Sequence, residues 1–340
     1  MKKALIDISV LLIFFTRHEQ FKYVFEQVRK ARPRRLFLYQ DGPRENHPDD
    51  LLNIMKCRAI TENIDWECEV QRKFQEKNIG VDPSGYLADI WAFSQTDKCI
   101  VLEDDVVPSV SFFGFCKQML DKYESNKQVM LISGFNVEEV TQDITSDYFF
   151  SKTTFTWGWA SWSRVVNQWD PQYKFLDNHI QREKVQKYIQ KNNLVKSMIQ
   201  VFYNHRYSGK EHFETILISN QYLHEGLTIV PQKNMINNIG IAEGSTHYAE
   251  NINYLPKGLR RIFTMKRYEL ALSNLVHPKG IVDFPKYQIR SYKIYGWGHP
   301  LIKLYRLTES LFYQITNGEF ESAKKEVIDK FKKLLNGLVG

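Results

Sequence analysis

The chain alternates short apolar runs with amphipathic segments over its first half, and this pattern predicts an α/β fold. Short apolar runs that end in turn residues predict buried strands of a parallel sheet, and apolar residues at helical spacing between them predict helices. A strand, a helix and a second strand within about 40 residues predict a right-handed βαβ unit. The predicted strands cover residues 8–15, 35–40, 68–72, 99–102, 129–134 and 227–230, and the predicted helices cover 21–32, 50–57, 83–94, 112–123 and 211–224.

The pattern fades beyond residue 251, except that residues 301–338 show apolar positions at helical spacing with basic residues opposite them. A helix of this kind either packs on a neighbouring domain or lies on an anionic membrane surface. We therefore expect one α/β domain over residues 1–250, with a mostly parallel central sheet and helices on both faces. A largely helical C-terminal extension is expected over residues 251–340.

Composition narrows the class of protein. The 340 residues are 43% hydrophobic, which is enough for one large domain with an extension. A net charge of +7 favours anionic partners. No Lys/Arg block with interleaved aromatic residues marks a nucleic-acid groove, so we expect no nucleic-acid partner. Four cysteines without CxxC spacing indicate reduced thiols.

The first residues imitate a secretion signal, with Lys2 and Lys3 before an apolar run to Phe15. However, Asp7 interrupts the run, no small-residue cleavage site follows, and the run is too short to cross a bilayer. The run therefore predicts a strand. We expect a cytoplasmic protein, with peripheral contact at the inner face of an anionic membrane as an open alternative.

Three consecutive carboxylates, Glu103, Asp104 and Asp105, follow the apolar run that ends at Leu102. The carboxyl end of a buried strand delivers such residues into the crevice where open α/β folds bind ligands. Clustered carboxylates repel one another, so they are stable in water or around a hard cation such as Mn²⁺ or Mg²⁺. A solvated acidic turn is the alternative, but the buried strand before the triplet and the helix that Ser109 can cap after it favour a metal site.

Four of the seven tryptophans lie within the thirteen residues from Trp157 to Trp169. Gly158 separates Trp157 from Trp159, which indicates a close approach to the backbone, and flat indole rings suit sugar faces. A tryptophan cluster is more often core than site, and we expect Trp162 and Trp169 to pack in the core, while a sugar-facing role stays open for Trp157, Gly158 and Trp159.

Residues 101–113 (VLEDDVVPSVSFF) resemble the DXD motif of nucleotide-sugar-dependent glycosyltransferases with the GT-A fold. The likeness is closest to a bacterial family related to the N-acetylglucosaminyltransferase of N-glycan branching, and it extends from about Ile8 to His247. It implies a Rossmann-like GT-A domain that binds a UDP-sugar. It also implies that Asp105 binds Mn²⁺ or Mg²⁺ and that Glu103 and Asp104 face the ribose and the sugar.

Two further segments of the first half carry the resemblance. The segments Phe14-Phe15-Thr16-Arg17 and 39–44 (YQDGPR) look like the family's first strand and its Asp-Gly-Pro-Arg turn. By this likeness Thr16, Arg17 and Asp41 would bind the nucleotide, although a turn-forming role for Asp41 stays open. The segment Lys77-Asn78-Ile79-Gly80 is similar to the family's Lys-Asn-Leu-Gly, which implies that Asn78 and Gly80 lie under the diphosphate-sugar.

The second half resembles the family at three more places. Residues 157–162 (WGWASW) resemble its Trp-Gly-Trp-Ala-Thr-Trp motif, with Ser161 in place of Thr, which implies that Trp157, Gly158 and Trp159 contact the donor sugar and the acceptor. Phe213-Glu214-Thr215 falls where the family has Trp-Asp-Tyr, which implies that Glu214 deprotonates the acceptor. A first-turn Glu that only complements the helix dipole is the alternative, and Glu211 and Asp170 are other candidates for the base. The segment 244–247 (GSTH) resembles Ala-Thr-His, which implies that His247 reaches the diphosphate or the metal.

The resemblance as a whole implies a metal-dependent, inverting glycosyltransferase that moves a sugar from a UDP-sugar to a glycan or glycolipid acceptor. A sugar nucleotidyltransferase is the nearest alternative, but it would carry a glycine-rich basic loop after the first strand, where this chain has Thr16-Arg17-His18-Glu19. A non-catalytic carbohydrate-binding protein is the second alternative. A basic nucleic-acid-binding module is the third, and it predicts steeply salt-dependent binding.

Overall fold

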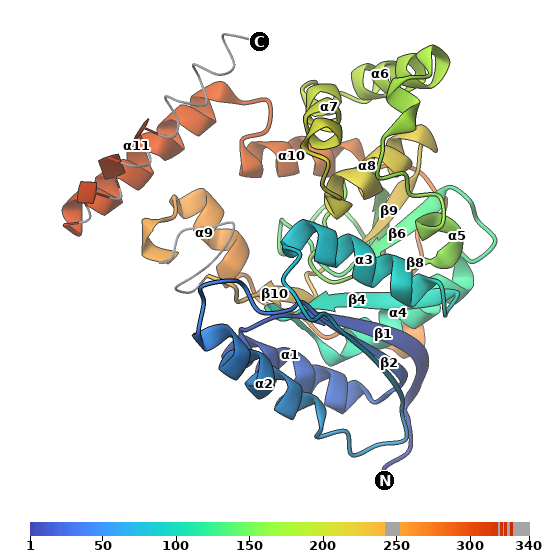
Figure 1. Cartoon of the computed structure of the whole chain (residues 1–340). Helices are drawn as coiled ribbons and strands as arrows, with labels where there is room; N and C mark the ends of the chain where they lie inside the picture. Colours follow the sequence, from blue (N-terminus) through green and yellow to red (C-terminus); the bar gives the residue numbers. More distant parts are fainter. Residues whose placement is uncertain (242–251, 319, 322, 325–326, 329–340) are drawn as a thin grey trace. The chain divides into compact units, whose positions relative to one another are not determined.

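The computed structural model describes residues 1–241, 252–318, 320–321, 323–324 and 327–328 (Figure 1). The chain divides into two compact units. The first comprises Met1–Gly240 and Met265–Arg290, and the second comprises Ile241–Thr264 and Ser291–Gly340. The boundary expected at residue 250 therefore differs from this division, because residues 265–290 return to the first unit. There the Tyr268 N–H donates to the Asn234 carbonyl at 2.8 Å.

An eight-stranded sheet forms the centre of the first unit. Six of the eight strands run in one direction, while β8 and β7 run opposite, which confirms the expected mostly parallel α/β sheet. In spatial order the strands are β3 (Glu69–Phe74), β2 (Pro33–Gln40), β1 (Ile6–Phe14), β4 (Lys98–Glu103), β8 (Trp159–Trp162), β6 (Val129–Ser133), β9 (Leu227–Pro231) and β7 (Tyr148–Ser151). The N-terminal apolar run is thus a strand, as predicted, and it lies in the interior of the sheet.

Helices cover both faces of this sheet, as the sequence predicts (Figure 1). One face carries α1 (His18–Ala31), α2 (Asp49–Thr61) and α4 (Val110–Lys122), and the other carries α3 (Val81–Phe93), α5 (Ser163–Val166) and α8 (Phe213–Leu223). The helices α6 (His179–Lys191) and α7 (Met198–Ser208) and the 3₁₀ turn η1 (Lys174–Leu176) connect α5 to α8. The apolar face of α1, from Phe21 to Val28, is buried as its periodicity predicts.

The cap of α4 differs from expectation. The Ser109 side chain makes no capping hydrogen bond. Instead the Glu269 carboxylate accepts hydrogen bonds from the Val110 N–H at 2.9 Å and the Ser111 N–H at 2.7 Å. A carboxylate at this position also complements the positive end of the helix dipole. The first turn of α4 is therefore held by a residue 159 positions away in the chain.

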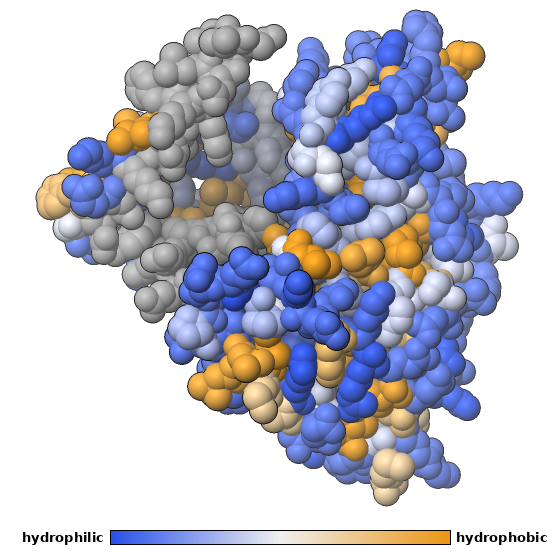
Figure 2. Space-filling view, in the orientation of Figure 1, coloured by the Kyte–Doolittle hydropathy of each residue, from blue (hydrophilic) through white to orange (hydrophobic). Residues whose placement is uncertain are grey.

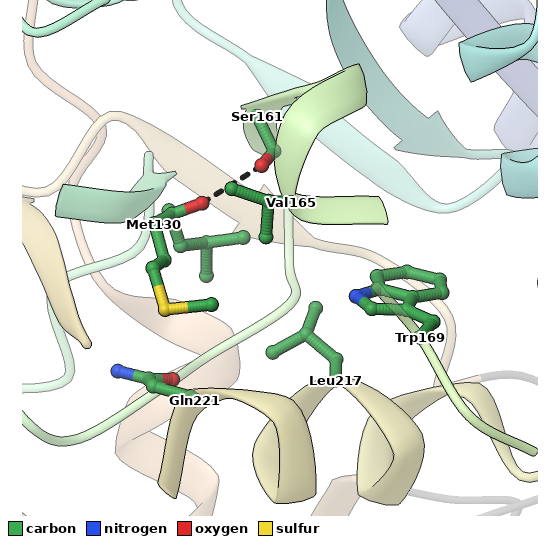
Figure 3. Close-up of a pocket in the computed structure, with 7 residues that line it drawn as sticks. Met130, Ser161, Val165, Trp169, Leu217 and Gln221 are labelled. Atoms are coloured by element: carbon green, nitrogen blue, oxygen red, sulfur yellow. Dashed lines mark hydrogen bonds between the residues drawn. The ribbon is translucent and has the colours of Figure 1, made fainter. Parts of the chain in front are cut away.

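The sheet and α8 enclose a small interior cavity of about 10 Å³ (Figure 3). Its lining is mostly apolar and includes Met130, Val165, Trp169 and Leu217. The Ser161 hydroxyl donates to the Met130 carbonyl at 2.7 Å beside it. A space of this size holds at most one water molecule, so it is a packing defect rather than a ligand site. Trp162 and Trp169 are buried, which confirms the prediction that they pack in the core.

The described residues of the second unit form helices, as expected for the extension. They include the 3₁₀ turn η2 (Ile252–Tyr254), α9 (Lys257–Thr264) and α11 (Pro300–Thr316), while α10 (Pro285–Tyr295) begins in the first unit. The first unit also holds the turn η3 (Leu272–Asn274) and a small antiparallel pair of β5 (Val106–Pro108) with β10 (Ile236–Asn238). Among the residues that the structure describes, no helix has the length and apolar character needed to cross a bilayer.

Candidate functional site

The carboxyl ends of β1, β2, β3 and β4 meet at one edge of the sheet, because these strands run parallel to one another. This edge carries Arg17 after β1, Asp41 after β2, the loop 75–80 after β3 and the triplet 103–105, which begins with the last residue of β4. Strand ends of this type form the ligand crevice of open α/β sheets. The fold therefore brings together residues that the sequence singled out separately.

An arginine pairs with the acidic triplet. Arg17 Nη1 lies 2.5 Å from Asp105 Oδ2 and 3.7 Å from Asp104 Oδ1. The Phe15 N–H donates to Asp104 Oδ2 at 3.0 Å. Asp104 and Asp105 are both buried, so donors from the protein stabilise their charge in place of water, and these contacts contribute to that. The end of β1 thus stabilises the negative charge that follows β4.

Burial and repulsion between neighbouring carboxylates raise the pKa values of Glu103 and Asp104. Burial, reinforced by the charges of Asp105, Glu214 and Asp104, holds the pKa of Glu103 well above its usual range. Burial and the Asp105 charge raise the pKa of Asp104 to about 7, against the opposing effect of Arg17. Such crowding of carboxylates is unfavourable without more positive charge, which makes the cluster a candidate cation site.

The segment after β10 closes over Asp105. The Ile239 N–H donates to the Asp105 carbonyl at 2.8 Å. Gly240 lies so close that a Cβ atom placed on it would be 2.0 Å from Asp105 Oδ2, so a side chain at this position would displace the carboxylate. The sequence analysis gave Gly240 no role, because its partner lies 135 positions earlier in the chain. His247 lies outside the described residues.

The Asp41 carboxylate holds the loop after β3. Asp41 Oδ1 accepts hydrogen bonds from the Gly42 N–H at 2.9 Å and the Ile79 N–H at 3.1 Å. Asp41 Oδ2 accepts from the Asn78 amide at 2.9 Å and the Gly80 N–H at 3.1 Å. The donors of Asp41 therefore come from the chain itself, which supports the turn-forming alternative. Nucleotide contacts of Asp41, Asn78 and Gly80 remain predictions.

Glu214 in the first turn of α8 reaches the same edge of the sheet. The Thr156 hydroxyl donates to Glu214 Oε1 at 2.9 Å, and the charge of Glu214 contributes to the raised pKa of Glu103. Glu214 is exposed, so its carboxylate is also accessible to a ligand. Thr156 was missed in the sequence analysis, although it directly precedes the Trp157-Gly158-Trp159 segment.

The two other candidate bases are placed less favourably. The Asp170 carboxylate accepts from the Gln172 N–H at 3.0 Å and the Lys174 N–H at 2.6 Å, so it stabilises the turn before η1. Together with burial, the charges of Glu211 and Asp170 raise the pKa of Tyr86, but neither contributes to the shift of Glu103. Glu214 is thus the one of the three whose charge reaches the acidic triplet.

The tryptophan segment is only partly at the site. Trp159 is 1% exposed and stacks against Phe93 in the core. The expectation that it faces a sugar was therefore wrong. Gly158 has a φ of +62°, and a Cβ atom on it would lie 2.5 Å from the Ile236 side chain. The close approach inferred for this glycine is therefore to Ile236 and not to a sugar. Trp157 is half-buried and packs on Phe135 with ring centroids 4.7 Å apart.

Trp157 and Thr16 both lie next to strand ends of the sheet. Trp157 precedes β8 by two residues, and Trp159 at the start of β8 pairs with Val101 of β4. Thr16 begins the turn that carries Arg17, and its carbonyl accepts the His18 N–H at 3.0 Å. Both residues remain candidates for donor contacts by position.

The donor set suits a hard cation that is shared with a substrate. In the described part of the chain, no group of three or more His, Cys, Asp or Glu side chains is arranged to hold a metal ion by itself. Mg²⁺ is commonly held by one or two protein carboxylates, with substrate phosphates and water completing its shell. Asp105 and Asp104, which both pair with the Arg17 guanidinium among the described residues, fit that pattern.

A second hollow lies at the opposite edge of the sheet, with a volume of about 430 Å³. It is lined by residues at the amino ends of β1, β2 and β4, and its wall carries four acidic and four basic side chains, several of which form ion pairs with one another. For example, Lys98 Nζ lies 2.9 Å from Asp121 Oδ1 and 3.0 Å from Glu124 Oε2. This balance of charge gives no reason to assign it a charged ligand.

Comparisons with known proteins give only distant likenesses. No family model matches the chain, and no curated protein matches its sequence. A UDP-glucose pyrophosphorylase solved with UDP-glucose is 10% identical, with a TM-score of 0.34 over 68% of this chain and 92% of that chain. A protein of Bacillus anthracis described as a glucose-1-phosphate thymidylyltransferase, solved with sucrose, is 12% identical, with a TM-score of 0.34 over 71% and 90%. Because these TM-scores are below 0.5, the reaction has to be inferred from the side chains of the site.

Proposed function

We propose that this chain is a glycosyltransferase that takes a sugar from a nucleotide-diphosphate donor and transfers it to an acceptor hydroxyl with the help of Mn²⁺ or Mg²⁺. A UDP-sugar as donor and a glycan or glycolipid as acceptor belong to the same proposal. The observation that carries it is the meeting of the acidic triplet, Arg17 and Glu214 at one edge of the sheet. A carboxylate cluster there suits a cation and a diphosphate, and a separate carboxylate suits a base.

In this proposal each group of the site has a distinct task. Asp105, with Asp104, would hold the cation, which when bound neutralises the charge that develops on the diphosphate leaving group. Arg17, which now pairs with Asp105, is placed to move onto a donor phosphate, since guanidinium groups bind phosphate as well as carboxylate. The hydrogen bonds to the Asp41 carboxylate hold residues 78–80 in place before the start of α3.

The chemical step needs one proton acceptor. The acceptor oxygen forms a bond to the anomeric carbon of the donor sugar, and the bond from that carbon to the phosphate oxygen breaks, so that the nucleoside diphosphate leaves with the electron pair. Glu214 would take the proton of the acceptor hydroxyl, while Thr156 fixes the orientation of the Glu214 carboxylate through its hydrogen bond. Attack opposite the leaving group gives inversion.

A sugar nucleotidyltransferase is the second candidate, and the products separate it from the first. A glycosyltransferase releases nucleoside diphosphate from a UDP-sugar, whereas a nucleotidyltransferase running in reverse needs pyrophosphate and yields nucleoside triphosphate and sugar 1-phosphate. The experiment incubates the protein with Mn²⁺ and a panel of nucleotide-sugars, with or without pyrophosphate, and identifies the products by ³¹P NMR. Nucleoside diphosphate formed without pyrophosphate supports glycosyl transfer or donor hydrolysis, and pyrophosphate-dependent triphosphate overturns the proposal.

The variant Asp105→Asn tests the site itself. It should weaken Mn²⁺-dependent donor binding by about 100-fold or more in a calorimetric titration. Residues that only hydrogen-bond to a metal ligand already contribute about 10–100-fold to metal affinity, so loss of a ligand itself should cost at least as much. Asp121→Asn is a matched control, because Asp121 is a carboxylate paired with cations at the opposite edge of the sheet. Equal donor affinity in Asp105→Asn and the unmodified protein would remove Asp105 from the site.

A further inference from the structure

The helix α11 has its polarity reversed relative to an ordinary surface helix. Its exposed side carries apolar side chains at helical spacing, between 49% and 79% exposed: Leu301, Leu304, Tyr305, Phe312 and Ile315. Its opposite side buries Ser310 and Gln314, which are 7% and 8% exposed. A helix that packs on a domain by its apolar face would show the opposite arrangement. We call the exposed set the α11 stripe.

Contacts within the second unit keep the stripe facing outward. The Gln314 amide donates to the Ser310 hydroxyl at 3.2 Å. The Arg306 guanidinium donates to two backbone carbonyls of α10, and the Arg260 guanidinium lies 5.3 Å from the Tyr313 ring centroid. If α11 rotated to bury the stripe within the unit, these polar contacts would be lost and the groups that make them would need new partners.

Charge indicates what the stripe contacts. Residues 241–264 and 291–340 contain 11 Lys and Arg against 7 Asp and Glu, so these 74 residues hold four of the seven net positive charges of the chain. An anionic surface attracts such a unit, by about 1 kcal/mol for each basic residue close to it. A second copy of the same unit would instead bring like charge together.

Aromatic side chains beside the stripe favour a bilayer interface. Tyr295 and Trp297 stack with ring centroids 4.7 Å apart in the turn that leads into α11, and Tyr292 contacts Trp297 at 5.6 Å. Tyr305 adds a phenol to the stripe itself. Trp and Tyr are enriched at the level of lipid headgroups, where one end of the ring is apolar and the other is hydrated.

We propose that α11 is a membrane-docking helix that lies on an anionic bilayer, with the stripe buried at the boundary between headgroups and acyl chains. A helix with one apolar and one polar side binds in this way through apolar burial combined with attraction to anionic lipid. The α11 stripe belongs to the second unit and contains no residue of the acidic triplet. The proposal therefore does not depend on the glycosyltransferase assignment.

The experiment measures co-sedimentation of the full chain with vesicles of phosphatidylcholine that contain or lack phosphatidylglycerol. The test variant is Leu304→Glu with Phe312→Glu. The control is Leu51→Glu with Met55→Glu, because these side chains lie one turn apart on α2 of the first unit and are each 59% exposed. Figure 2 shows that apolar surface is also present on the first unit. All four positions are exposed, so both variants should fold, and circular dichroism verifies this.

We expect binding to the anionic vesicles that weakens with salt, and a loss of at least about tenfold in the α11 variant but not in the α2 variant. Three results would overturn the proposal: no binding to anionic vesicles, equal binding by both variants, or a folded α11 variant that turns a solution dimer into a monomer. The last result would show that a second copy covers the stripe.

Discussion

Arg17 Nη1 lies 2.5 Å from Asp105 Oδ2, so a cation that binds Asp105 competes with a guanidinium for the same oxygen. The pair joins the end of β1 to the end of β4 across 88 positions of sequence. It also explains how buried carboxylates can lie side by side, since Arg17 opposes the rise in the pKa values of Glu103 and Asp104.

The first prediction separates the two roles of Arg17. Arg17→Gln should bind Mg²⁺ alone about tenfold more tightly, because a repelling cation is removed, and should bind nucleotide-sugar with Mg²⁺ less tightly, because a phosphate contact is lost. Calorimetric titration above pH 8 measures both affinities under conditions where Asp104 is ionised. Arg17→Lys keeps the charge and controls for it. Weakened binding of Mg²⁺ alone to Arg17→Gln would contradict competition for Asp105.

The second prediction concerns the base. Glu214→Gln should keep donor affinity and lower kcat by about 10²–10⁴-fold, the usual contribution of a positioned general base. Thr156→Val should give a smaller loss of kcat, because the carboxylate stays but loses the hydroxyl that orients it. Steady-state kinetics with saturating donor measures both effects. Glu211→Gln is the matched control, and activity in Glu214→Gln equal to that of this control would exclude Glu214.

The third prediction distinguishes the loop-holding role of Asp41 from nucleotide binding. Asp41→Ala removes the acceptor for the N–H groups of residues 42, 78, 79 and 80, so the free energy of unfolding should fall by about 1–3 kcal/mol. Urea denaturation measures this, with Asp7→Ala as a control at an exposed carboxylate of β1. Unchanged stability with weakened donor binding would assign Asp41 to the nucleotide alone.

The fourth prediction concerns Asp89, which is completely buried on α3 and has no hydrogen-bond partner among the described residues. Burial holds its pKa well above the usual range. In the pH range between the two pKa values, the folded state keeps a proton that the unfolded state has released. Stability is therefore highest below about pH 4 as far as this group is concerned, and falls as the pH rises toward the folded-state pKa.

The variant Asp89→Asn removes this titration. The free energy of unfolding at neutral pH should rise by at least about 1 kcal/mol, since each unit of pKa shift corresponds to about 1.4 kcal/mol. Urea denaturation from pH 5 to pH 8 should give a flatter profile than that of the unmodified chain. An unchanged slope in the variant would show that Asp89 remains ionised in the folded protein.

The sequence predicted the local elements well because their signals are local. The strand over 8–15 and the helix after it follow from apolar periodicity, and the structure gives β1 at Ile6–Phe14 and α1 at His18–Ala31. The cap of α4 was predicted wrongly, because Ser109 has the right type and position but Glu269, which lies far away in the chain, provides the carboxylate. Local patterns do not reveal such distant partners.

The tryptophan segment is a second case in which local sequence did not decide the outcome. Its residue types suit both a core and a sugar-binding surface, so composition alone does not decide between them. Trp159 became core because β8 lies between β4 and β6, and Gly158 is required by Ile236. Trp157, only two residues from Trp159, remains at the edge.

By itself, the sequence determined the α/β class and the acidic triplet at the end of a buried strand, because apolar periodicity and adjacent carboxylates are properties of neighbouring residues. The tertiary structure alone decided that Arg17 pairs with Asp105, that Thr156 holds Glu214 and that the apolar side of α11 faces outward. These outcomes depend on which distant segments the sheet and helices bring together, and the first two join residues 88 and 58 positions apart.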